Sequence, residues 1–163
     1  MTTILGIDVL SFLVVAPALA AVIMLLLPRE HKFIGRWVAL LLALGIGAVA
    51  VSVFLSYDSS VAGYQFESKV PWFELLGASW HVGIDGISAV MVLLTGILIP
   101  LAVLVSWEIE DRVNMHMALI LFFATGLMGV FVALDLMIFF LFWELSLVPM
   151  YFLINQWGGP NRK

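Results

Sequence analysis

The sequence contains no cysteine. The chain therefore cannot form a disulfide bond, and it cannot supply the thiolate ligands of an iron–sulfur cluster or of a cysteine-rich zinc site. Its three histidines, His31, His81 and His116, are scattered and make no metal-ligand spacing. No nucleophile–base pair and no phosphate-binding loop is recognisable. The sequence thus predicts no metal site, no bound cofactor and no autonomous active site in this chain.

Charged residues are also scarce. They make up 11% of the 163 residues, whereas 64% are hydrophobic and the mean hydropathy is +1.17. Soluble domains are roughly half apolar and about a quarter charged. A soluble fold of this size could not bury so much apolar surface, so the expected solvent is lipid. The net charge of -4 is then no sign of an acidic substrate, and no nucleic-acid partner is expected.

Five stretches are long and apolar enough to cross a bilayer, which takes roughly 20 such residues. The predicted fold class is therefore an all-α polytopic membrane protein with helices over 9–27, 35–56, 84–107, 115–133 and 136–156. Ala18-Leu19-Ala20 resembles a signal-peptidase site. However, no Lys or Arg precedes the first apolar run, and the run continues past this site to Leu27, so residues 9–27 are interpreted as a retained helix.

The positive charges predict the orientation. With the N-terminus outside, one side of the membrane carries Arg29, Lys32, Arg36, Arg112, Arg162 and Lys163, and the other carries only Lys69. Lys and Arg prefer the cytoplasmic side. We therefore expect a bacterial inner membrane, with the N-terminus periplasmic and residue 163 cytoplasmic.

The polar stretch 57–83 is then an external loop. Apolar and polar residues alternate around Phe66 and again around Val82, which indicates two short strands flanking Pro71 and Gly77, in a hairpin-like loop on the membrane surface. At the other side, Glu108, Glu110 and Asp111 are interpreted as a solvated cytoplasmic turn.

Glu144 is the strongest candidate for a functional residue. It lies eight residues into the fifth predicted helix, between Phe139-Phe140-Leu141-Phe142-Trp143 and Leu145-Ser146-Leu147-Val148. A charge near the bilayer centre costs about 2.5–3.5 kcal/mol on insertion scales, so such residues are usually functional. Glu144 is therefore predicted to take up and release protons inside the membrane.

Four further residues are candidates for supporting roles. Pro149 lacks a backbone donor, so it leaves the carbonyl of Leu145 unpaired and favours a kink beside Glu144. The indole N–H of Trp143 needs a partner within the membrane, and Glu144 is near. Asp135 forms the short turn before the fifth helix and suits its N-cap. His116, at the mouth of the fourth helix, is interpreted as an interfacial residue rather than a proton relay.

Some features favour packing over chemistry. Pro17 and Pro100 are expected to shape the first and third helices, since proline is tolerated in membrane spans. Thr125 and Gly129 form a small-xxx-small pair that predicts a close helix contact. Asp85, within Gly83-Ile84-Asp85-Gly86, is expected to cap a helix, because the strand–turn–helix setting and third glycine of a nucleotide loop are missing.

These residues resemble a known family. The run from Phe139 to Ile154 with Trp157-Gly158-Gly159, and the upstream run from His81 to Ser88, are similar to the fifth and third helices of the M subunit, or chain 4, of proton-pumping NADH:quinone oxidoreductase (complex I). The resemblance implies that residues 1–163 are a single membrane domain, the N-terminal portion of a longer antiporter-like subunit. In that family the glutamate matched by Glu144 pairs with a lysine on a later, broken helix, and no such lysine occurs here.

The resemblance also implies the function and the partners. The chain would couple electron transfer from NADH to quinone with proton translocation, and its partners would be other membrane-arm subunits and the lipid bilayer. NADH, FMN, iron–sulfur clusters and quinone would bind to other subunits. Two alternatives remain. One is a subunit of a cation/proton antiporter complex or a membrane-bound hydrogenase, and the other is a truncated, non-pumping membrane module.

Overall fold

The computed structural model describes the chain except residues 1–2, 5–6, 29–31, 74–76 and 159–163. Its described part contains five helices that are long and apolar enough to cross a membrane. They are α1 (Val9–Leu26), α2 (Lys32–Leu55), α3 (Gly86–Val105), α4 (Val113–Val132) and α5 (Leu136–Trp157). The prediction of a five-helix polytopic membrane protein is confirmed.

The helix ends differ from the predicted ones by up to three residues. The predicted third helix is wrong at both ends, because Ile84 is the last residue of a strand and Ser106–Glu108 form a separate 3-10 turn, η2. Asp85 caps α3 as predicted, since its side chain accepts a hydrogen bond from the Ser88 N–H at 2.8 Å. Residues of a strand and a helix can be equally apolar, so hydropathy alone does not separate them.

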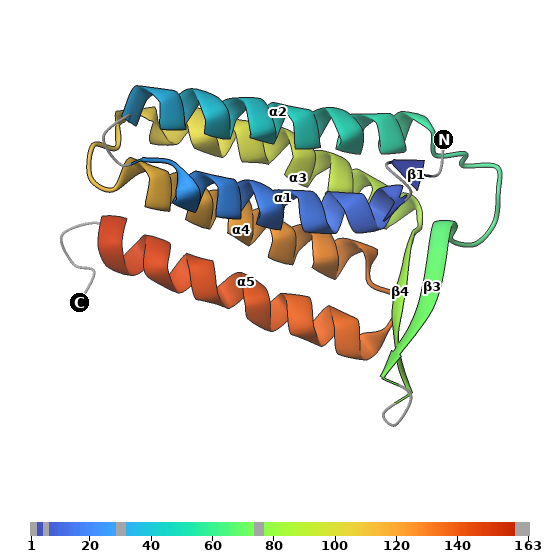
Figure 1. Ribbon diagram of the computed structural model, residues 1–163. Coiled ribbons are helices and arrows are strands. Elements are labelled where there is room, and N and C mark those ends of the chain that lie inside the picture. The colour runs from blue at the N-terminus through green and yellow to red at the C-terminus, as the bar shows by residue number, and fades with distance from the viewer. Residues whose placement is uncertain (1–2, 5–6, 29–31, 74–76, 159–163) are drawn as a thin grey trace.

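The five helices run antiparallel to their chain neighbours and lie side by side (Figure 1). α4 is the central helix: it packs against α1 and α5 most extensively, and also against α3 and α2. α5 lies at the edge of the bundle, where its main neighbour is α4. The order and lengths of the helices could be predicted from the sequence. Which helix lies at the centre (α4) and which at the edge (α5) could not.

A two-stranded antiparallel hairpin closes one end of the bundle (Figure 1). It consists of β3 (Gln65–Phe73) and β4 (Ala78–Ile84). The predicted strands are confirmed, although β3 runs through Pro71, which pairs with Ser79 just before a shift of register. Two very short strands, β1 (Thr3–Ile4) and β2 (Ile7–Asp8), pair at the same end and were not predicted.

Small residues let α4 and α5 approach closely. A Cβ atom at Gly126 would lie 2.7 Å from the Cβ of Ser146, and one at Gly129 would overlap the ring of Phe142. Membrane helices associate through van der Waals packing, which small residues permit. The close contact predicted around Gly129 is therefore confirmed, with Gly126 as its second member; Thr125, the predicted partner, is buried at 4% exposure.

Candidate functional site

Helix α5 has one packed face and one open face. The packed face repeats at helical spacing and consists of Ile138, Phe142 and Pro149, which are buried, with Leu145 half-buried among them. The open face carries large apolar side chains, such as Phe140 at 60% and Tyr151 at 64% exposure. Nothing in the described part of the chain covers this second face.

Glu144 lies on the open face. It is exposed, and within the described residues it makes no hydrogen bond and no ion pair. No other residue of the five helices themselves is acidic. At a rise of about 1.5 Å per residue it stands about 12 Å from the start of α5. The structure thus presents one carboxyl group, deep in a spanning helix, to whatever covers this face.

Pro149 and Trp143, the predicted supporting residues on the same helix as Glu144, have different surroundings. Pro149 is buried on the α4 side, and α5 continues through it. The ring of Trp143 lies 6.0 Å from that of Phe139 between centroids, and its carbonyl accepts a hydrogen bond from Ser146 Oγ at 2.7 Å. The indole N–H of Trp143 donates no hydrogen bond in the part of the chain described here. The predicted partner near Glu144 is therefore not seen.

Asp135 caps α5 as predicted. Its Oδ1 accepts the N–H groups of Met137 at 2.9 Å and Ile138 at 3.3 Å, and its Oδ2 accepts the N–H of Ser79 at 3.0 Å. The hydrogen bond from the Ser79 N–H, and those from Met137 and Ile138, hold the pKa of Asp135 below its usual value of 3.8. One carboxylate thus joins the start of α5 to the hairpin.

The hairpin also contacts the turn before α5, α5 itself and α1. The N–H of Leu134 donates to the carbonyl of His81 at 2.8 Å. The ring of Trp80 packs edge-on against Phe142 at 5.9 Å, and its indole N–H donates to Ser11 Oγ in α1 at 2.7 Å. Trp80 therefore links α1 and the packed face of α5 at the hairpin end.

His116 lies at the opposite end of the bundle. It is 8% exposed, its Nε2 is 3.0 Å from Ser106 Oγ, and its ring lies 4.7 Å from that of Trp157 at the end of α5. The indole of Trp157 also donates to the carbonyl of Asp111 at 3.0 Å. His116 is thus a buried residue in the first turn of α4 that packs against the end of α5.

The acidic turn between α3 and α4 is solvated, and it also forms ion pairs with α2. Glu110 accepts hydrogen bonds from Arg36 at 2.8 Å and Lys32 at 3.1 Å, both from the first turns of α2. These two cations hold the pKa of Glu110 below its usual range. Glu110 is still 70% exposed, as expected for a solvated turn. Its pairing with Arg36 and Lys32, which lie 74 and 78 positions away in the chain, could not be predicted by sequence inspection.

Comparison with known proteins identifies related chains. The chain is 40% identical over 156 residues to F(420)H(2) dehydrogenase subunit M of Methanosarcina mazei, and 36% identical over 155 residues to an NAD(P)H-quinone oxidoreductase chain 4 of Nostoc sp.. The predicted resemblance is confirmed. Both alignments cover 94% of this chain, which spans about three tenths of the length of these relatives. No protein-family model matches the chain.

Two solved structures share the arrangement of the helices. A chain of respiratory complex I from Thermus thermophilus matches with a TM-score of 0.79 and 27% identity, over 94% of this chain and 30% of that one. A chain of the Mrp complex from Dietzia sp. matches with a TM-score of 0.74 and 20% identity, over 93% and 16%. The second match shows a common fold and no more.

Proposed function

We propose that this chain is the N-terminal portion of a membrane-arm subunit of a proton-translocating quinone oxidoreductase of the complex I type, and that Glu144 transfers protons within it. The chain would act in an enzyme complex without binding a redox group itself. One observation carries the proposal: Glu144 is the only acid within the five helices, and it stands on the open face of α5 without a partner among the described residues.

A carboxylate on a lipid-facing surface would be costly, at about 2.5–3.5 kcal/mol or more near the bilayer centre. The open face of α5 is therefore expected to contact protein. This chain spans about three tenths of its relatives, so the remaining length of such a subunit can supply further helices and the cation that pairs with Glu144. A change in the position of that cation would favour uptake or release of the proton, since a nearby positive charge stabilises the carboxylate.

The names of the relatives support the assignment of the electron donor to another subunit. Their names give different donors, F(420)H(2) in one case and NAD(P)H in another, although each shares 36% to 40% identity with this chain. A segment that bound the donor would be expected to differ between them. NADH or another donor, FMN, iron–sulfur clusters and quinone are accordingly assigned to other subunits, and the membrane-arm subunits are the expected partners.

The charges support the predicted orientation. Lys32, Arg36 and Arg112 lie together at one end of the bundle, and Lys69 lies in the hairpin at the other. With positive residues inside, the hairpin and the N-terminus face the periplasm of a bacterial inner membrane, and the end of α5 faces the cytoplasm.

The decisive test is Glu144→Gln in the full assembly, which keeps the size of the side chain and removes its proton. We expect quinone-dependent proton translocation into proteoliposomes to fall by about tenfold or more, since a positioned acid–base group contributes at least that much. Glu144→Asp should retain part of the activity. Glu108→Gln, an exposed acid of η2, is the matched control and should pump normally.

Wild-type pumping by the Glu144→Gln variant would overturn the role of Glu144. If Gln and Leu at this position changed only stability, the chain would be a non-pumping membrane module. The fold shared with the Mrp complex favours, as a second candidate, a subunit of a cation/proton antiporter, and a membrane-bound hydrogenase is the related alternative. Proton transport that requires Na⁺ but no electron donor would identify the antiporter.

A further inference from the structure

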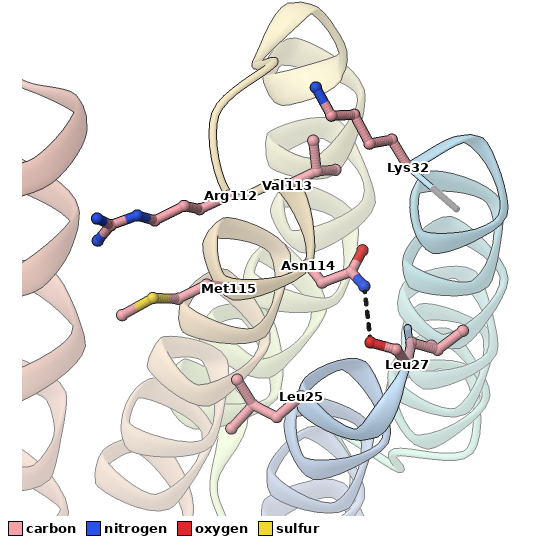
Figure 2. Close-up of a pocket in the computed structure, with 7 residues that line it drawn as sticks. All are labelled: Leu25, Leu27, Lys32, Arg112, Val113, Asn114 and Met115. Atoms are coloured by element: carbon pink, nitrogen blue, oxygen red, sulfur yellow. Dashed lines mark hydrogen bonds between the residues drawn. The ribbon is translucent and has the colours of Figure 1, made fainter. Parts of the chain in front are cut away.

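A cavity of about 490 Å³ opens at the end of the bundle opposite the hairpin, where α1 ends and α2 and α4 begin (Figure 2). Its lining comes from segments far apart in the sequence. Leu25 lies in the last turn of α1 and Leu27 directly follows that helix, Lys32 lies in the first turn of α2, and Arg112, Asn114 and Met115 lie at the start of α4. The cavity therefore exists only in the folded bundle.

The lining combines two chemistries. Lys32 and Arg112 are cationic, and Figure 2 shows them on opposite sides of the cavity, with Arg112 extended away from α2. Leu25, Leu27 and Met115 provide an apolar wall, and Leu25 is 63% exposed. A ligand that fits both parts has an anionic head and an apolar body.

The two cations have donors to spare. Lys32 donates to Glu110 at 3.1 Å, and Arg112 donates through Nη1 to Gln156 Oε1 at 3.1 Å. An ammonium group has three donors and a guanidinium has five. A phosphate oxygen can therefore bind either side chain without breaking its present hydrogen bond.

The start of α4 adds to the attraction for an anion. Arg112 is its N-cap residue, in the left-handed region with φ 49° and ψ 46°, and makes no side-chain cap hydrogen bond. Uncapped N–H groups and the helix dipole favour negative charge at such an end. Asn114 fixes the floor, since its Nδ2 donates to the carbonyls of Leu27 at 3.1 Å and Pro28 at 3.3 Å.

We propose that this cavity binds an anionic phospholipid, with the phosphate at the start of α4, between the two cations, where it can bind either Lys32 or Arg112, and an acyl chain along Leu25 and Met115. A soluble anion would use only the polar half of the lining. The cavity lies at the ends of three spanning helices, which is the depth of the headgroups. Basic pockets between membrane helices are known to take such lipids. The proposal does not depend on the role of Glu144.

The test is photo-crosslinking in native membranes. Phosphatidylglycerol with a diazirine on its acyl chain is added, the assembled protein is purified, and the labelled peptides are identified by mass spectrometry. We expect labelling at residues 25–27 and 113–115. Because each cation near an anionic surface contributes about fivefold in affinity, Lys32→Gln with Arg112→Gln should lower labelling by about tenfold or more.

Matched variants separate charge from folding. Lys32→Arg with Arg112→Lys keeps both charges and should keep the labelling. Lys69→Gln removes a cation at the other end and should change nothing. Glu110→Gln breaks the same ion pair as Lys32→Gln but leaves Lys32 free for the lipid, so labelling should stay or rise.

Four results would overturn the proposal. Equal labelling by a phosphatidylcholine probe would mean ordinary lipid contact, and loss of labelling on adding inorganic phosphate would mean a site for soluble anions. Absence of labelling at these peptides would mean that protein fills the cavity. A loss of labelling in Glu110→Gln equal to that in the double variant would mean that binding depends on an intact turn between α3 and α4, not on the charges of Lys32 and Arg112.

Discussion

Helices α4 and α5 are neighbours that hydropathy does not distinguish. They have 20 and 22 residues and nearly equal mean hydropathy, yet 61% of the residues in an 18-residue stretch of α4 are buried, against 17% in α5. Their compositions differ in the size of the side chains. α4 contains Ala118, Ala124, Gly126 and Gly129 among its buried residues, whereas the α5 sequence contains neither glycine nor alanine.

This difference shows what determines burial in a membrane helix. Apolar residues favour lipid and protein surroundings alike, so hydropathy does not determine which helix is central. Small residues allow several helices to approach α4, and its position in the bundle follows. The bulky residues of α5 pack against one neighbour along one face. Its other face, with Glu144, is available to further helices.

The largest expected effect is that of Gly129→Leu in α4. The new side chain would overlap the ring of Phe142 and force α5 away. We expect a loss of about 3 kcal/mol or more, at the upper end of overpacking costs, measured as the change in unfolding midpoint in lipid nanodiscs. Gly45→Leu in α2 is the control, since a Cβ there has nothing within 4 Å. Equal losses would mean that α4 and α5 are not in close contact.

A smaller effect is expected from Phe142→Ala, compared with Tyr151→Ala on the open face of the same helix. Phe142 is 6% exposed and Tyr151 is 64% exposed. Deleting the buried ring should lower the free energy of unfolding by about 2 kcal/mol. The usual cost is the sum of a transfer term and a cavity term. Only the cavity term applies here, because helices that separate in a membrane expose the ring to lipid, which is also apolar. Tyr151→Ala should be neutral in this chain. A cost for Tyr151→Ala in the full assembly alone would show that protein covers the open face.

The smallest effect is expected at Asp135, which joins α5 to the hairpin. Its pKa is lowered in the folded state, so its contribution to stability is present above the usual pKa of 3.8 and is lost as the pH falls through the folded value. Asp135→Asn should retain the cap but remove this pH dependence, whereas Asp135→Ala should lose both. Thermal unfolding from pH 7 downward measures this, and an unchanged pH profile in Asp135→Asn would contradict it.

Much of the fold is local and could be predicted. Five apolar runs are enough to give five helices, and Asp85 and Asp135 are polar residues at helix starts, where their side chains accept backbone N–H groups. The resemblance at Phe139 to Gly159 also rests on sequence alone. The helix ends were less certain, because Ile84 is apolar both in a strand and in a helix.

The site was predictable only in part. An acid such as Glu144 within an apolar run is visible in the sequence, and so is Pro149. Their spacing of five residues already puts them about 140° apart around a helix. Which of the two sides packs against the bundle is not visible without α4. Similarly, the pairing of Glu110 with Lys32 and Arg36, and the Trp80 hydrogen bond to Ser11, join residues distant in the chain and leave no local pattern.

The sequence by itself determined the solvent, the number of spans and the depth of Glu144, because each depends on the order of polar and apolar residues along one segment. Only the tertiary structure decided which face of α5 is packed, that Glu144 lies on the other face, and that Lys32, Asn114 and Arg112 line one cavity. These depend on close packing between helices, which is set by the shapes of residues that the chain order does not bring together.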